Sequence, residues 1–281
     1  LGLDQPIPLQ YVRWGGRAAL GEFGDSLDSS VPAGKIVADR FGNSAALMAV
    51  VLVLAVPLAF LGGVALAIRR DSRFDRWTMN AIILFKALPA FVLAIGLILL
   101  FSTTVFPILP AVSLLDPEIS PLLQPIYLVL PALTLILIVA PFLLRLVRSA
   151  MIETLEAEYV AAARLRGIPE WRIIWTHAVP NALVPVIQGI ALTSRLLLGG
   201  GLIVEVVFSY PGIGNALNSA IEMRDVPVIQ AITLTMAVGV VGINLLADVA
   251  TVLVTPKLRT SARPRLRAGT RAKLKLKAGG V

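Results

Sequence analysis

The 281-residue sequence contains no cysteine and only one histidine, His177. Without cysteine the chain has no disulfide framework, no thiol nucleophile and no thiolate metal site. A single histidine also excludes a His-rich metal centre, and no nucleophile, base and orienting group cluster along the sequence. We therefore expect no metal site and no catalytic site. Charge is scarce as well: 15% of the residues are charged, whereas soluble domains carry about a quarter.

Hydrophobic residues are abundant instead, at 57% of the chain with a mean hydropathy of +0.84. This composition indicates a membrane protein. The net charge of +8 comes from the C-terminal tail, because residues 257–281 hold nine lysines and arginines and no acid. The rest of the chain has 16 basic and 17 acidic residues. The charge therefore gives little support to a nucleic-acid partner.

Five long apolar segments are candidate membrane spans, because a bilayer requires about 20 apolar residues in a helix. They comprise residues 44–68, 78–106, 126–144, 184–208 and 228–254. Each must be helical, because an open strand would leave its backbone groups without partners in lipid. The predicted fold class is all-α transmembrane.

The loops between these segments predict the orientation, since Lys and Arg concentrate on the cytoplasmic side. Four arginines follow the first span within residues 69–76, whereas the loop at 107–125 has acidic residues and no basic one. This pattern predicts an extracytoplasmic segment at 1–43, a transmembrane domain at 44–254 with a cytoplasmic loop at 145–183, and a basic cytoplasmic tail at 255–281. Because an exported segment of 43 residues would have no signal before it, we expect a further helix upstream of this numbering; the alternative is that a short polar N-terminus crosses the membrane unaided.

The cytoplasmic loop has a helical pattern. Residues 151–166 lack Gly and Pro and are rich in Ala, Leu, Glu and Arg, which predicts one helix that Gly167 ends. Tyr159, Ala162, Ala163 and Arg166 would share one face of it. A second helix is predicted after Pro169, with Pro180 separating it from the next span. On pattern alone, a helix lying on the bilayer surface explains this segment as well.

Two stretches of this loop resemble a known motif. Residues 158–167 read Glu-Tyr-Val-Ala-Ala-Ala-Arg-Leu-Arg-Gly, and residues 177–186 read His-Ala-Val-Pro-Asn-Ala-Leu-Val-Pro-Val. Together they resemble the EAA loop of binding-protein-dependent ABC importer permeases, in particular the B-type dipeptide and oligopeptide subfamily. The resemblance extends to residues 1–6, 21–26, 199–205, 207–214, 224–228 and 244–248. The sequence departs from the general motif at Ala161, where the motif has Glu, and at His177.

This resemblance implies a type I ABC importer permease fold with six helices per protomer, the first of which would be absent here. It implies that the helix before Gly167 is a coupling helix seated in a cytoplasmic ATPase. The residues it assigns to ATPase coupling are Glu158, Tyr159, Ala161, Ala162, Ala163, Arg164, Arg166, Gly167, His177 and Pro180. The implied partners are a second homologous permease, two ABC ATPase subunits or domains, an external substrate-binding protein and membrane lipid, in the inner membrane of a prokaryote.

The chain does not carry the ATPase itself, because a P-loop needs a lysine followed by Ser or Thr and no lysine here is followed by either. ATP and Mg²⁺ would be used by the partner subunits, and this chain would bind no cofactor. Gly199-Gly200-Gly201 lies within a predicted span, where glycines predict close helix packing or a hinge.

Two charges lie inside the fourth span. Arg195 is predicted near mid-membrane, where a charge costs at least about 2.5 kcal/mol, so it should face a cavity or a carboxylate. Arg195 is therefore a candidate for substrate contact or for structural pairing. Glu205, nearer the outer end, is a candidate gate or interface residue, or else a carboxylate satisfied within the fold.

Three other functions stay open at this level. An ion-gradient-driven transporter would need midplane carboxylates and an internal repeat, and neither is clear in the sequence. A membrane scaffold would explain the loop but not Arg195, and an enzyme has no support from clustered groups. For the importer, the subfamily implies peptides, with glutathione or nickel as alternative substrates.

Overall fold

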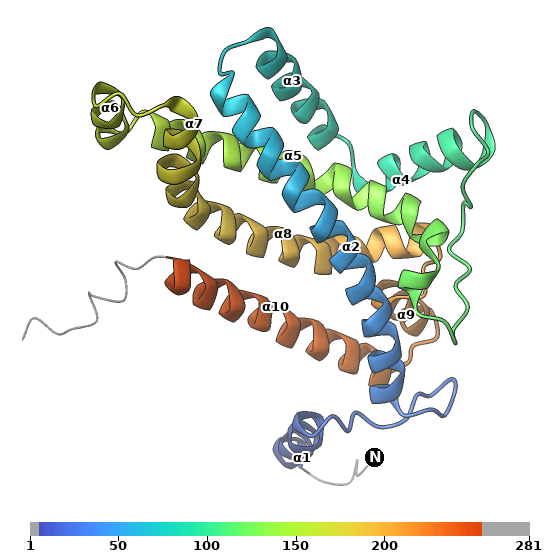
Figure 1. The fold of residues 1–281 in the computed structure, drawn as a ribbon. Helices are drawn as coiled ribbons and strands as arrows, with labels where there is room; N and C mark the ends of the chain where they lie inside the picture. The colour runs from blue at the N-terminus through green and yellow to red at the C-terminus, as the bar shows by residue number, and fades with distance from the viewer. Residues whose placement is uncertain (1–5, 255–281) are drawn as a thin grey trace, which may run out of the picture.

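The structure is a computed structural model of the protein and describes residues 6–254 (Figure 1). Secondary structure in this range is helical, apart from an isolated bridge between Asp25 and Pro32. Four helices are long and apolar enough to cross a membrane. They are α2 (Ala33–Ile68), α5 (Pro125–Leu155), α10 (Val226–Val254), and α8 (Val179–Val207) together with the turns before it. The all-α transmembrane class is confirmed, and the basic tail at 255–281 lies outside the described residues.

The second predicted span, residues 78–106, is not a single straight helix. The chain forms α3 (Arg73–Ala87), then α4 (Ala90–Ile98) and a π-helical turn η1 (Leu99–Thr103), and the two parts are bent by 100°. Leu88 adopts an extended conformation before Pro89, because the proline ring disfavours helical geometry in the preceding residue. Figure 1 shows the resulting elbow: α3 and α4 run in different directions, while α4 still packs against α5 and α8.

Shorter helices lie at the two ends of the bundle. At one end, which we call the α6 end, α6 (Glu158–Leu165) and α7 (Glu170–Arg172) lie near the last turns of α2 and α5 (Figure 1). At the other, the α9 end, lie α1 (Ile7–Ala19) and α9 (Ile213–Glu222). A 3-10 turn, η2 (Pro121–Leu123), precedes α5. The arginines of residues 69–76 and 145–172 all flank the α6 end, which agrees with the predicted alternation of loops.

The helix α5 is the centre of the bundle, packed between α2 and α8. Glycines allow these close approaches. A Cβ at Gly63 of α2 would lie 2.6 Å from Cβ of Val147, and one at Gly189 of α8 would lie 2.1 Å from Cδ2 of Leu146. Without side chains at these points the helix backbones come together, as small residues permit in membrane helices.

The three glycines of α8 behave differently. A Cβ at Gly199, Gly200 or Gly201 would meet no atom within 4 Å. The prediction that this triplet serves close packing is therefore wrong for the helices described here. The tight contacts of α8 lie elsewhere: at Gly189, ten residues after its start, and at Glu205, two residues before its end, whose carboxylate lies close to Gly212 and Gly214.

Candidate functional site

The predicted helix over residues 151–166 is in fact two helices. The helix α5 ends at Leu155, and α6 begins at Glu158 after Ala157, whose backbone is extended (ψ 146°). No Gly or Pro marks this break in the sequence. The reason is tertiary: turning the chain lets Val160 and Ala163 pack against Ile173 of the following helix, and all three become buried. Burial of this small cluster outweighs the helical propensity of the segment.

Gly167 ends α6 as predicted, and its geometry shows how. Its φ is +75°, a conformation that favours glycine. The Gly167 amide donates to the Arg164 carbonyl (2.9 Å), and the Ile168 amide donates to the Ala163 carbonyl (3.3 Å). This pair of bonds is a Schellman cap, and the accompanying apolar contact between Ile168 and Ala163 is present. The turn sends the chain back against α6, so α6 and α7 form a hairpin.

An ion pair closes this hairpin. Arg164 Nε lies 2.7 Å from Glu170 Oε1, and its Nη2 lies 3.4 Å from Glu170 Oε2. The same guanidinium donates to the Leu155 carbonyl at 3.4 Å, at the end of α5. Arg164 therefore joins α5, α6 and α7, although the pair is half exposed and contributes at most about 1 kcal/mol. A groove of about 240 Å³ runs beside it, lined by the ends of α2 and α5 and by Glu170 and Ile174.

The predicted stripe of α6 is partly wrong, because Ala163 turns inward. The surface that α6 presents outward consists of exposed residues: Glu158, Tyr159, Ala161, Ala162, Leu165 and Arg166. Leu165 is 90% exposed and Tyr159 45%. Figure 1 shows α6 at one extremity of the described part of the molecule, with α7 beside it and no other helix of residues 6–254 covering its outer side. An apolar, aromatic and basic surface on a short, capped helix is available there for a partner.

His177 and Pro180 lie on the helix that follows α6. That helix runs without a break from Glu170 to Val207, so Pro180 does not separate two helices. Pro180 has no amide to donate, and the backbone accommodates it with a π-helical turn, η3 (Ile173–Ala178), in which the Val179 amide donates to the Ile174 carbonyl. The His177 carbonyl accepts from Asn181 Nδ2 (2.7 Å). Both residues are linked to α6 only through this continuous helix and the packing of Ile173.

The two charges of α8 do not meet each other, since ten residues of continuous helix place them about 15 Å apart. Arg195 Nε is buried with no hydrogen-bond partner, and no carboxylate in residues 6–254 forms an ion pair with this side chain. The structure brings no counter-ion to it.

Glu205, by contrast, is only 4% exposed and well satisfied. Its Oε1 accepts from Ser44 Oγ (2.6 Å), and its Oε2 accepts from the Gly214 amide (2.6 Å). Ser44 Oγ in turn accepts from the Ile213 amide (2.8 Å). The carboxylate therefore joins α2, α8 and the start of α9.

A tyrosine completes this junction. Tyr210 is buried, and its hydroxyl donates to the Asn43 carbonyl (2.7 Å), while Asn43 Nδ2 donates to the Pro211 carbonyl (2.8 Å). Burial, and secondarily the nearby Glu205, raise the pKa of Tyr210, so its hydroxyl stays a donor at any physiological pH. Asn43 and Ser44 did not stand out in the sequence, and Tyr210 lay within the resembling stretch 207–214 without an assigned role, since the partner of each lies far along the chain.

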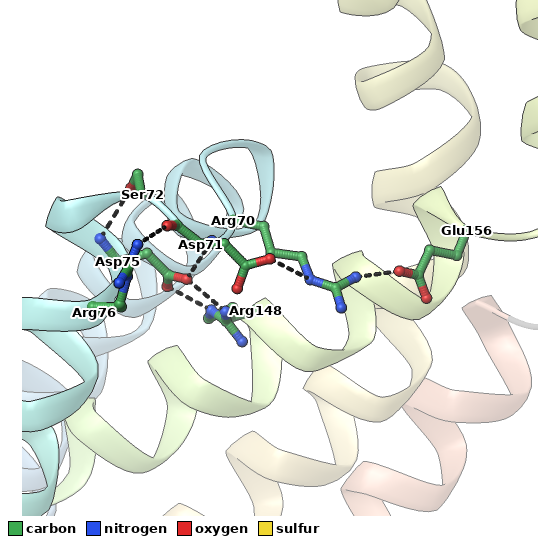
Figure 2. A network of polar contacts seen from close by, with 7 residues as sticks. All are labelled: Arg70, Asp71, Ser72, Asp75, Arg76, Arg148 and Glu156. Atoms are coloured by element: carbon green, nitrogen blue, oxygen red, sulfur yellow. Dashed lines mark hydrogen bonds and ion pairs between the residues drawn. The ribbon is translucent and has the colours of Figure 1, made fainter.

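A second missed group is an ion pair at the α6 end, where Arg148 of α5 holds Asp75 of α3 (Figure 2). One signal was available: Ser72-Arg73-Phe74-Asp75 has the spacing of a helix-capping motif, and Ser72 does accept from the Asp75 amide (3.1 Å). The cap predicts the start of α3, but the arginine 73 residues away could not be foreseen.

Comparison with known proteins identifies relatives of the whole described bundle. The family model described as "Binding-protein-dependent transport system inner membrane component" matches residues 59–260. A protein of Brucella suis biovar 1 whose name describes a peptide permease is 35% identical over 266 residues, covering 93% of this chain and 82% of that protein. The glutathione transport system permease protein GsiC of Salmonella paratyphi A is 34% identical over 259 residues, covering 92% of this chain and 82% of that protein.

A solved structure supports the same architecture. The MetNI methionine ABC transporter, in inward-facing conformations, matches with a TM-score of 0.61 over 79% of this chain and 95% of that chain. At 18% sequence identity this match concerns the fold alone.

Proposed function

The chain belongs to the family of binding-protein-dependent transport system inner membrane components, and from this membership we propose that it forms part of an ATP-driven import pathway for peptides. It is a permease component of an ABC importer, and such a component implies an ATPase and a substrate-binding protein as partners. The proposed assembly pairs this chain with a second homologous permease and with two ATPases that bind and hydrolyse ATP with Mg²⁺. The chain itself acts as a non-catalytic subunit.

The surface of α6 is the observation that supports coupling to an ATPase. The helix is short, stands at the extremity of the α6 end, and has its buried side fully used by Val160, Ala163 and Ile173. Its other side offers Tyr159, Leu165 and several small or charged residues to a partner. The arginines that flank this end favour a cytoplasmic position for it under the positive-inside rule, and an ATPase would reach it there.

Peptides are the substrate class that the relatives' names favour. The name of the Brucella suis relative describes a peptide permease, and the Salmonella relative is named for glutathione, itself a short peptide derivative. Glutathione is therefore the second candidate substrate. Family membership favours an ATP-driven importer over an ion-gradient-driven transporter or a scaffold.

The test is reconstitution of the complex in proteoliposomes with its ATPases and binding protein. We expect ATP-dependent uptake of short peptides by the wild-type complex. In the Ala162→Asp variant a charge enters the exposed face of α6, and we expect both ATPase association and uptake to be lost. Ala162 is preferred over Ala163, because Ala163→Asp would also disrupt the apolar cluster inside the hairpin.

The matched control is Ala19→Asp, the same change on an exposed alanine at the α9 end. It should leave ATPase association unchanged. Uptake driven by a proton or sodium gradient without ATP would refute the importer assignment. Normal ATPase binding by the Ala162→Asp variant would refute the role of α6.

A further inference from the structure

Helix α3 buries only two of its residues against the bundle, one in its first turn and one in its third. Within α3 only Asp75 and Ile82 are buried, whereas Phe74, Trp77, Ile83 and Leu84 are 59–75% exposed. The elbow after α3 turns α4 away by 100°. How α3 moves with the other helices therefore depends strongly on the contact at Asp75.

The Asp75 carboxylate is fully engaged, as Figure 2 shows. Arg148 approaches it in a bidentate manner, with Nε 2.7 Å from Oδ1 and Nη2 2.6 Å from Oδ2. Oδ2 also accepts from the Asp71 amide (3.0 Å), which closes the turn between α2 and α3. The side chains of Asp75 and Arg148 are only 3% and 18% exposed. A bidentate pair is directional, and the loss of one partner from a largely buried pair is costly because it leaves the other charge uncompensated.

A second pair continues this attachment toward α6. Arg70, at the end of α2, pairs with Glu156, which lies directly between α5 and α6. Arg148 and Glu156 are eight residues apart, which is about 12 Å along α5. The turn between α2 and α3 and the start of α3 are therefore bonded to the last two turns of α5 and the residue after it, directly before α6 (Figure 2). The pair of Arg70 and Glu156 is half exposed and weaker.

We infer that the pair of Asp75 and Arg148 makes α3 follow the end of α5 when a partner displaces α6, and so transmits the ATPase stroke to the elbow of α3 and α4. This inference rests on the proposed function, in which α6 receives that stroke. Asp75 and Arg148 are positioning residues: they touch neither the ATPase nor the substrate, and they keep two helices moving as one body.

The measured quantity is substrate taken up per ATP hydrolysed by the reconstituted complex. In Asp75→Asn the side-chain shape is kept but the charge pair is lost. We expect uptake per ATP to fall by about tenfold or more, equivalent to about 1.4 kcal/mol of coupling, while ATP hydrolysis continues. The control is Asp71→Asn in the same turn. The Asp71 side chain is 82% exposed, and its backbone amide, which bonds Asp75, is retained. It should stay within about twofold of wild type.

A second variant tests attachment without charge. Because the chain has no cysteine, Asp75→Cys with Arg148→Cys introduces its only two thiols. A short bifunctional methanethiosulfonate that joins them should restore uptake per ATP, and reduction should remove the gain. A joined pair that stays uncoupled overturns the inference. The inference is also overturned if Asp75→Asn and Asp71→Asn show the same uptake per ATP while uptake by the wild-type complex is normal. Absence of ATP-driven uptake in the wild-type complex would refute the proposed function itself.

Discussion

Removal of the Glu205 carboxylate should destabilise the α9 end of the protein. In Glu205→Ala the Ser44 hydroxyl and the Gly214 amide both lose a charged acceptor at 2.6 Å. A hydrogen bond to a charged group contributes about 1.5–3 kcal/mol, and a buried donor left unpaired adds its desolvation cost. The expected loss in the free energy of unfolding is about 3–5 kcal/mol, since two bonds to a carboxylate that is only 4% exposed are lost.

The conservative variant should lose less. Glu205→Gln keeps one acceptor oxygen but presents its amide group to the other donor, so one of the two bonds is lost and the expected loss is about 1.5–3 kcal/mol. The expected order of stability has Glu205→Ala lowest, Glu205→Gln intermediate and wild type highest. This order is a stricter test than either value alone. If the Glu205 side chain only filled space, Glu205→Gln would be as stable as wild type, because Gln fills the same volume as Glu.

The assay is thermal unfolding of the protein in detergent, followed by tryptophan fluorescence. For a chain of this size each kcal/mol shifts the midpoint by roughly 2–4 °C, so Glu205→Ala should unfold at least about 6 °C below wild type. Glu222→Ala is the matched control: it removes an exposed carboxylate at the end of α9, which accepts a hydrogen bond from Asn218 Nδ2 (2.7 Å). If Glu205→Ala unfolded within about 1 °C of that control, the reasoning about the buried junction would be refuted.

Two smaller predictions concern packing and the neighbouring tyrosine. Gly63→Ala forces a Cβ to within 2.6 Å of Val147 and should lower the free energy of unfolding by about 1–3 kcal/mol in the same assay. Its control is Gly96→Ala, where nothing lies within 4 Å of the new Cβ and stability should be unchanged or slightly higher. Equal unfolding midpoints for the two variants would contradict the close approach of α2 and α5. Tyr210→Phe removes the hydrogen bond to the Asn43 carbonyl and should cost about 1–3 kcal/mol, and an unchanged midpoint would show that water or a shifted side chain replaces it.

Several features could be predicted because their signals are local. A run of apolar residues long enough for a bilayer predicts a helix wherever it lies, so α2, α5, α8 and α10 were expected. Gly167 could be assigned as a helix end because helices often end in a left-handed conformation that glycine tolerates best, and its φ is indeed +75°. The EAA-like residues predicted the family, and comparison with known proteins confirmed it.

The failures share one cause, which is that long-range packing overrides local preference. Pro89 breaks a span whereas Pro131, Pro141 and Pro185 lie inside continuous helices, and the proline residue is the same in each case. The residue type alone therefore does not tell which proline breaks a helix. The break after Leu155 has no proline or glycine at all, and follows from the burial of Val160 and Ala163 on Ile173.

By itself the sequence determined the membrane class, four of the five spans and the segment that resembles a coupling motif, and it predicts how the spans alternate, because hydrophobic length, loop charge and helix caps are read from neighbouring residues. Only the tertiary structure decided the elbow of α3, the hairpin that turns Ala163 inward, the grip of Arg148 on Asp75 and the burial of Glu205. The longest in sequence of the contacts involved, between Ser44 and Glu205, joins residues 161 positions apart. Such partners are chosen by how whole helices pack, and no local pattern records that choice.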